Sequence, residues 1–214
     1  MLRNIIIYKN HFLDFYRKQD LKTQTKIEYV LDLIRFEQHV PKKLYKLLKN
    51  TDGIWEIRVI TSLNSICILC FQEKGNIVVL VNSFIKKTQK TPKSEIRMAE
   101  KLKKEYFKEK QRQHNKMTMK DITNFEDLLI SKYGEKGTLT RDLYDTDSLS
   151  FRLGVMLKKA RKEAQLTQEE LATKTGTKKS YISRIERGES DIQVSTYQHL
   201  VEIGLGRCLN ISIE

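Results

Sequence analysis

The segment from Leu166 to Gly188 carries the side chains whose types and spacing are best suited to chemistry, and that chemistry is hydrogen bonding to nucleic acid. Lysine, serine, tyrosine and arginine side chains are concentrated here: Lys178, Lys179, Ser180, Tyr181 and Arg184. Such donors match the acceptors that phosphates and base edges present in the major groove of DNA. The segment is therefore a candidate DNA-binding surface.

Two short helices must position these donors. Thr167 is suited to cap the first helix, and Glu170, three residues later, completes the pattern of a capping box. Gly176 lies where the chain must turn tightly before the second helix. We predict that this second helix runs over Thr177–Arg187.

Apolar side chains fix which face of each helix is buried. Leu171 and Ala172 can face a core from the first helix, and Ile182 and Ile185, three residues apart, form one stripe on the second. The donors then lie on the opposite face. An ordinary helical hairpin with a solvated basic face is the alternative, but capping, turn, stripe and donors agree here.

The segment from Phe151 to Gly204 resembles the Xre/Cro-like helix-turn-helix family, above all in LTQEELA and ISRIERG. The resemblance implies an all-α domain that binds operator DNA as a two-fold homodimer. It also implies that Gln168 contacts a DNA phosphate. The residues that it implies for the groove are Thr177, Lys178, Lys179, Ser180, Tyr181 and Arg184.

Composition limits the remaining possibilities. A chain of 214 residues with 39% hydrophobic residues can bury two small cores. No apolar run approaches the roughly 18 residues of a membrane span. At the start, MLRNIIIYKN, the apolar run is too short for a signal peptide and a charged residue follows it closely. We therefore expect a cytoplasmic protein without membrane contact. Cys67 and Cys70 form a lone CxxC without a second ligand pair, so we expect no metal and no cofactor.

The positive charge lies in one half of the chain. Residues 1–116 contain 25 Lys plus Arg and 12 Asp plus Glu, whereas residues 117–214 contain 15 of each. The whole excess of +13 therefore lies in the half without the DNA motif. Such a surface favours a polyanionic partner such as RNA. The alternative is solubility charge on lysine-rich helices, particularly over Lys101–Lys116.

Hydrophobic periodicity predicts an α+β fold for the N-terminal half. The predicted helices are Leu21–Glu37 and Lys93–Lys110. The predicted strands are Asn4–Tyr8, Ile54–Ile60, Ser65–Phe71 and Asn76–Phe84. A turn at Glu73-Lys74-Gly75 makes the last strands an antiparallel meander. The polar segment Gln111–Lys120 has no apolar stripe, so we predict a linker there.

The region from Arg3 to Lys110 resembles the RelE/HigB superfamily of bacterial toxins, often described as phage-derived Gp49-like proteins. The resemblance lies in KKLYKLLKNTDGIWEIRV from Lys42 and in NSFIKKTQKTP from Asn82 to Pro92. It implies an antiparallel sheet with helices and a metal-independent endoribonuclease that cuts messenger RNA on the ribosome. In the related HigB/HigA-type operons the toxin gene precedes that of an Xre-like antitoxin, which is the order found in this chain.

Metal-free RNA cleavage drives the 2′-hydroxyl onto the adjacent phosphate, so charge on the crowded phosphorane must be stabilised. By resemblance, the catalytic candidates are Arg58, Lys86, Lys87 and Lys90. By resemblance, Lys43 and Lys46 are the RNA-binding candidates. Arg58 alternates with Ile57 and Val59, so its side chain leaves their apolar face and can reach a cleft.

The sequence also departs from the family pattern. Family members commonly carry an arginine at or beside the positions of Ile66 and Cys67, and many use a late histidine or tyrosine as acid or base. The histidines outside the matching motifs are His11, His39 and His114, and Tyr106 lies on an apolar stripe. An alternative function therefore stays open, that of a transcription regulator whose N-terminal half is a catalytically inactive RNA- or protein-binding module.

Residues 117–150 read as the antitoxin's own N-terminal region. A helix is predicted through Phe125, Leu128, Leu129 and Tyr133, and it stops near Gly134. The acidic segment 138–147 is expected to be extended or loosely ordered before a helix over 149–164. Its acidic residues either meet the toxin's basic surface or belong to a solvated loop: Asp142, Asp145 and Asp147.

The predicted organisation has four parts: a toxin domain over residues 1–110, a linker or junction over 111–120, an antitoxin N-terminal region over 121–148 and a helix-turn-helix domain over 149–214. Met117 resembles a translation start, so a natural fusion and two proteins written as one chain both remain open. The partners expected are the ribosome and messenger RNA, operator DNA, and the two modules for each other.

Overall fold

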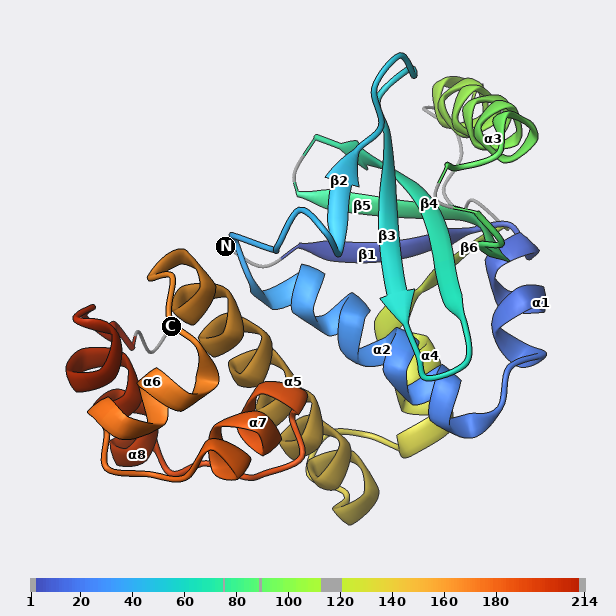
Figure 1. Cartoon of the computed structure of the whole chain (residues 1–214). Coiled ribbons are helices and arrows are strands. Elements are labelled where there is room, and N and C mark those ends of the chain that lie inside the picture. The colour runs from blue at the N-terminus through green and yellow to red at the C-terminus, as the bar shows by residue number, and fades with distance from the viewer. Residues whose placement is uncertain (1–2, 75, 89, 113–120, 212–214) are drawn as a thin grey trace. The chain divides into compact units, whose positions relative to one another are not determined.

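The computed structural model describes residues 3–74, 76–88, 90–112 and 121–211 (Figure 1). Over these residues the chain forms two compact units, which divide between Lys132 and Tyr133. The predicted linker is described only at residues 111 and 112, which end a helix. The rest of that linker, with Met117 and His114, and Gly75 of the predicted turn lie outside the described residues.

The N-terminal unit is built on a six-stranded sheet with the strand order β2-β3-β4-β5-β1-β6. The strands are β1 (Asn4–Tyr8), β2 (Tyr45–Leu47), β3 (Ile54–Ile60), β4 (Ser65–Glu73), β5 (Ile77–Ile85) and β6 (Ile122–Asn124). The meander from β3 to β5 is antiparallel, as predicted. Strand β1, however, pairs parallel with β5, with Ile5 opposite Val78. The sheet is therefore mixed and not wholly antiparallel.

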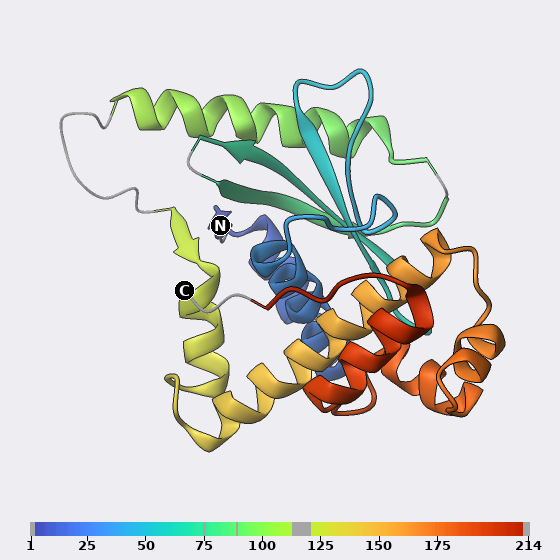
Figure 2. The ribbon, with the colours of Figure 1, turned by 90° about the vertical axis from the view of Figure 1, so that its left-hand side faces the viewer.

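Helices cover both faces of this sheet (Figure 2). Helices α1 (His11–Arg17) and α2 (Leu21–Phe36) lie on one face, and α3 (Lys93–Arg112) lies on the other. The α3 face holds a core that includes Leu69 of β4 and Tyr106 of α3. Because both faces are covered, β4 is buried at six consecutive positions, which explains its unbroken apolar run.

Three short elements were not predicted from the sequence: α1, β2 and β6. The two strands have three residues each, which is too few for a periodic pattern. Strand β6 pairs antiparallel with the outer edge of β1, so residues 121–132 belong to the N-terminal unit. The predicted segment 121–148 is therefore not one region, since it is divided between the two units.

The C-terminal unit is helical. Helix α4 (Phe125–Tyr133) ends at the boundary between the two units. The elements that follow are α5 (Leu139–Glu163), α6 (Gln168–Lys174), α7 (Lys179–Arg187), α8 (Val194–His199) and a π-helical turn (Leu200–Gly204). Helix α4 ends at the predicted place, where Gly134 adopts a φ of 87° that favours glycine. No helix among the described residues has the length and apolar character needed to cross a membrane.

The expectation of a loosely ordered acidic segment is wrong, because α5 runs unbroken from Leu139. Tyr144, Ser148 and Phe151 are buried at spacings of four and three, so this segment presents one helical face. The acidic residues make local contacts. Asp145 pairs with Arg141 at 3.1 Å, and Asp142 accepts a hydrogen bond from a backbone N–H just before the helix.

Two glycines allow α5 and α7 to pack closely. A Cβ at Gly154 of α5 would overlap the carbonyl oxygen of Ile185 in α7. A Cβ at Gly188 would lie 2.6 Å from Cα of Phe151, and Gly188 also ends α7 with a φ of 71°. The core beneath them includes Ile182 and Ile185, which confirms the predicted stripe.

Candidate nucleic-acid interfaces

A buried carboxylate gathers three basic side chains on the α3 face of the sheet. Glu56 of β3 is 1% exposed. Its Oε1 lies 2.5 Å from Nζ of Lys86, and its Oε2 lies 3.2 Å from both Nη2 of Arg58 and Nζ of Lys46. Thr91 donates a further hydrogen bond to Oε1 over 3.2 Å. We call Glu56, Lys46, Arg58 and Lys86 the cation cluster.

Strand register explains how the cation cluster assembles. Glu56 and Arg58 are two residues apart on β3, so both side chains point to the same face. Lys46 of β2 stands directly opposite Glu56 in the ladder. Lys86 follows β5, where its N–H bonds to the carbonyl oxygen of Ser65 beside the start of β4. Three separate chain segments therefore meet at one carboxylate.

The charge state of Glu56 follows from its neighbours. Burial raises the pKa of its carboxyl, but the hydrogen bond and charge of Lys86, with Arg58 and Lys46, outweigh burial and lower the pKa to about 2. The carboxylate is therefore ionised at neutral pH. Because its pKa lies below the ordinary value, it stabilises the fold at neutral pH, and this contribution is lost as the pH falls from about 4.5 toward 2.

The three cations differ in access. The side chain of Lys86 is 4% exposed and also donates to Thr91, so it anchors the cluster. Arg58 and Lys46 are 26% and 43% exposed, so both reach solvent while paired. The Nε of Arg58 is buried and has no hydrogen-bond partner within the described part of the chain. The exposed part of the guanidinium, and not this Nε, is what an incoming anion can reach.

The other predicted RNA-site residues lie apart from Glu56. Lys43, Lys87 and Lys90 are exposed, whereas the described ion pairs of Glu56 are with Lys46, Arg58 and Lys86. Sequence analysis missed Glu56 itself, together with Thr91. The available signal was the spacing of WEIR, since a carboxylate two residues before Arg58 must share its face of the strand.

The alternative acid and base candidates lie elsewhere. Tyr106 is buried in the α3 core and donates to Glu73 over 2.6 Å. Burial and this hydrogen bond raise its pKa, which suits a structural tyrosine. His11 and His39 are exposed. The resemblance implies an arginine at or beside Ile66 and Cys67; both of these side chains are buried, and Cys67 donates from Sγ to Glu56.

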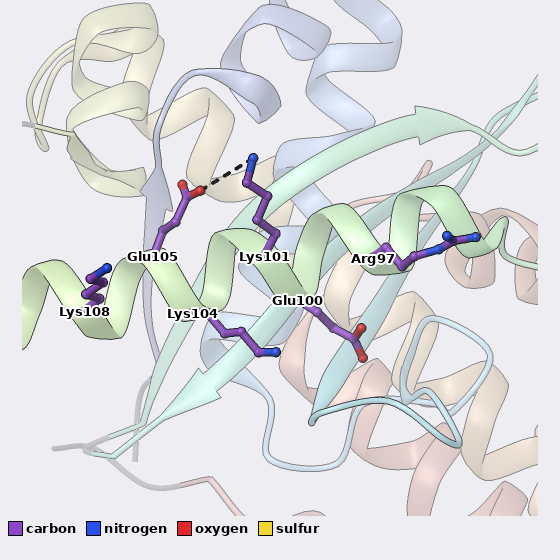
Figure 3. A pocket seen from close by; sticks show the side chains of 6 residues that line it. All are labelled: Arg97, Glu100, Lys101, Lys104, Glu105 and Lys108. Carbon is purple, nitrogen blue, oxygen red and sulfur yellow. Dashed lines mark ion pairs between the residues drawn. The ribbon is translucent and has the colours of Figure 1, made fainter.

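A depression on the outer surface of α3 is lined by residues of that helix alone (Figure 3). Its lining residues are Arg97, Glu100, Lys101, Lys104, Glu105 and Lys108. Lys101 and Glu105 form an ion pair across one helical turn at 3.9 Å. None of the predicted site residues lines this depression.

In the C-terminal unit, the predicted capping box is present. Thr167 Oγ1 accepts from the N–H of Glu170 at 3.1 Å, and Glu170 Oε2 accepts from the N–H of Thr167 at 2.6 Å. Helix α7 begins at Lys179, two residues later than predicted, because Lys178 adopts an extended N-cap conformation and Thr177 lies in the turn. Thr177 and Lys178 therefore precede the helix.

Helix α7 presents its donors to solvent. Lys178, Lys179, Ser180 and Arg184 are exposed, and Thr177 and Tyr181 are half-buried. Lys179 pairs with Glu169 of α6 at 3.3 Å, an exposed contact that a phosphate can replace. The six predicted DNA-contact residues of this region thus lie together at the turn and on the outer face of α7.

Gln168 has a structural partner that sequence analysis did not foresee. Its Nε2 donates to Oε2 of Glu186 over 2.8 Å. Glu186 also accepts two hydrogen bonds from Arg161 of α5, at 2.5 Å to Oε1 and 2.9 Å to Oε2. This buried network ties α5, α6 and α7 together, and it holds Gln168 at the first position of α6.

Comparison with known families defines the class of each unit. Residues 14–104 match the model of the phage derived protein Gp49-like family (DUF891), and residues 157–203 match a helix-turn-helix family model. The chain therefore carries a Gp49-like domain followed by an Xre-like helix-turn-helix domain. The first match contains the whole cation cluster, and the second contains α6 and α7. Comparison with curated proteins gives no match.

Proposed function

We propose that this chain joins a toxin and its antitoxin, with a metal-independent messenger RNA endoribonuclease in the N-terminal half and an operator-binding repressor in the C-terminal half. The observation that carries the proposal is the cation cluster in a Gp49-like domain, in the same chain as a helix-turn-helix with exposed donors. The full excess of positive charge in residues 1–116 supports an RNA partner.

The cation cluster suits the stabilisation of developing negative charge. In the proposed reaction the 2′-hydroxyl loses its proton to water and its oxygen forms a bond to phosphorus. The bond from phosphorus to the 5′-oxygen breaks and that oxygen takes a proton from water, which leaves a 2′,3′-cyclic phosphate and a 5′-hydroxyl. Arg58 is held by Glu56 and stays partly exposed, so its guanidinium is preorganised to bind the crowded phosphorane oxygens. Lys46 is the more exposed cation and is assigned to phosphate positioning. Lys86 acts through Glu56, because its ammonium is already enclosed.

One observation favours a second function for the N-terminal half. The arginine that the resemblance implies at or beside Ile66 and Cys67 is missing, and the charge of the buried Lys86 is paired with Glu56. A catalytically inactive RNA- or protein-binding module attached to a transcription regulator would fit these features. The growth experiment below distinguishes this regulator from the toxin.

Expression of residues 1–116 alone should arrest bacterial growth, and co-expression of residues 117–214 should relieve the arrest. Residues 1–134 provide a second fragment, since they retain β6 and α4, which complete the N-terminal unit. Growth curves and mapping of transcript ends measure the two effects. Normal growth with intact transcripts, while both fragments are folded and abundant, contradicts the endoribonuclease and favours the regulator.

The helix-turn-helix supports DNA binding, and we propose that the C-terminal half binds a roughly palindromic operator as a homodimer, with half-sites about one helical turn apart. Lys178→Ala should weaken operator and random duplex alike and lower the salt slope by about one. Arg184→Ala should cost about 1–3 kcal/mol and relax discrimination at one base pair.

Titration of the full-length variants with both duplexes at several salt concentrations separates these two roles. Ser190→Ala, beyond the end of α7, is the matched control and should bind as the parent does. Parent-like affinity in both the Lys178 and Arg184 variants would show that this face of α7 does not contact DNA.

A further inference from the structure

The segment Asp121–Lys132 follows the N-terminal half in sequence but completes its fold. Strand β6 extends the sheet along β1, with Thr123 opposite Ile7. The backbone N–H of Lys9 also donates to the carbonyl oxygen of Asp121 over 2.8 Å. Backbone pairing of this kind supplies affinity for an extended segment at a sheet edge.

Helix α4 continues this attachment through side chains. Phe125 and Leu129 are each 1% exposed, so one face of the helix is fully buried. Glu126 Oε2 lies 2.5 Å from Nη1 of Arg35 in α2. Six residues later, Nζ of Lys132 lies 2.6 Å from Oε1 of Glu28, also in α2. The ion pairs thus fix the helix at both of its ends.

The charges of the two surfaces are complementary. Residues 121–132 hold three acidic residues and one basic residue, a net charge of −2, whereas residues 1–116 carry +13. The single basic residue, Lys132, is the one that meets the fully buried carboxylate of Glu28. Strand register, apolar burial and charge therefore all specify one position for the segment.

We propose that Asp121–Lys132 is a docking segment, by which the C-terminal half of the chain holds the N-terminal half. The surface it occupies is the outer edge of β1 together with the adjoining face of α2, which fits a strand followed by an acidic amphipathic helix. On this view the covalent connection between the halves is dispensable, because the docking segment joins them. The proposal does not depend on RNA cleavage.

The docking surface is separate from the cation cluster. Strand β6 lies at one edge of the sheet and β2, which carries Lys46, lies at the other. Strands β4, β5 and β1 stand between Glu56 on β3 and the docking segment. The segment therefore holds the N-terminal domain without itself covering the proposed RNA site.

The experiment uses the full chain with a protease recognition site inserted between Lys116 and Met117. After complete cleavage, the two fragments should elute together from a size-exclusion column at low micromolar concentration. Separation of two folded fragments would overturn the proposal. Because the readout is association, its outcome is independent of whether the N-terminal half cuts RNA.

Charge-reversal variants assign the association to the docking segment. Arg35→Glu places two carboxylates together and should weaken the cleaved complex roughly tenfold or more, since like charges in an interface cost several kcal/mol. Arg35→Glu/Glu126→Arg should restore binding. Lys22→Glu, an exposed change of equal charge on the same helix, is the matched control. Unchanged association in Arg35→Glu would overturn the proposal.

Hydrogen exchange on the uncut chain provides a second measurement that needs no fragment. In Arg35→Glu the amides of residues 121–132 should exchange faster, while those in the β3–β4 pair should keep the protection of the parent chain. The double variant should return residues 121–132 to parent protection. Equal loss of protection across the whole sheet would show general unfolding and would overturn the assignment of a separable segment.

Discussion

Replacing Arg58 by alanine should reduce messenger RNA cleavage by the proposed toxin about a hundredfold or more. Arg58 is the cluster's guanidinium, and its side chain is 26% exposed while Glu56 holds it. Removal of one preorganised donor to a transition-state oxyanion typically costs about 2.7–4 kcal/mol, which gives this loss of rate. Cleavage of a translated transcript by the purified N-terminal domain with ribosomes measures the effect.

Two variants separate this role from general positive charge. Arg58→Lys keeps the charge but loses the planar fork, so it should recover only part of the activity. Lys87→Ala removes an exposed cation outside the cation cluster, so its effect should be much smaller. Full activity in Arg58→Ala, with parent-like tryptophan fluorescence from Trp55 on the same strand, would remove Arg58 from the proposed site.

Replacing Arg161 by methionine should destabilise the C-terminal unit by about 3–5 kcal/mol, because it leaves a buried carboxylate without its cation. Arg161 makes both guanidinium contacts with Glu186 and donates from Nη1 to the carbonyl oxygen of Leu166 over 2.6 Å. Glu186 is 1% exposed at its side chain. Among the described residues, only the side-chain amide of Gln168 would still donate to this carboxylate.

Urea unfolding of the full chain, followed by two probes, measures this loss. The midpoint of the helical circular dichroism should fall, whereas the fluorescence of Trp55, the single tryptophan, should keep its midpoint because it lies in the N-terminal unit. Arg207→Met breaks the exposed pair with Glu163 and should cost less than about 1 kcal/mol. An equally small effect in Arg161→Met would contradict the structural role of the buried pair.

Sequence by itself determined the helix-turn-helix in detail. The capping box of Thr167 and Glu170, the turn at Gly176 and the stripe of Ile182 and Ile185 are all confirmed. They were predictable because each depends on residues three or four positions apart, within one helical turn. Local apolar patterns likewise predicted the long helices and the antiparallel meander of the N-terminal unit.

The prediction for the acidic segment was wrong because its charged residues obscured the helical spacing of its buried ones. The acidic segment before Ser148 was expected to be loosely ordered, yet it forms the first turns of α5. Its buried side chains repeat with helical spacing, but exposed aspartates stand between them. The sequence did not predict strand β6 either. A strand of three residues is stabilised by pairing with the edge of β1 and not by its own sequence.

Only the tertiary structure decided how the RNA-site candidates relate to one another. Lys46, Arg58 and Lys86 come from three segments, and antiparallel register brings them to one carboxylate, Glu56. The sequence identified the basic residues as candidates. It could not show that the side chain of Lys86 is buried or that its charge is paired with Glu56. The reason is physical: burial and charge pairing depend on which distant strands become neighbours, whereas capping and helical stripes depend on residues that are already adjacent along the chain.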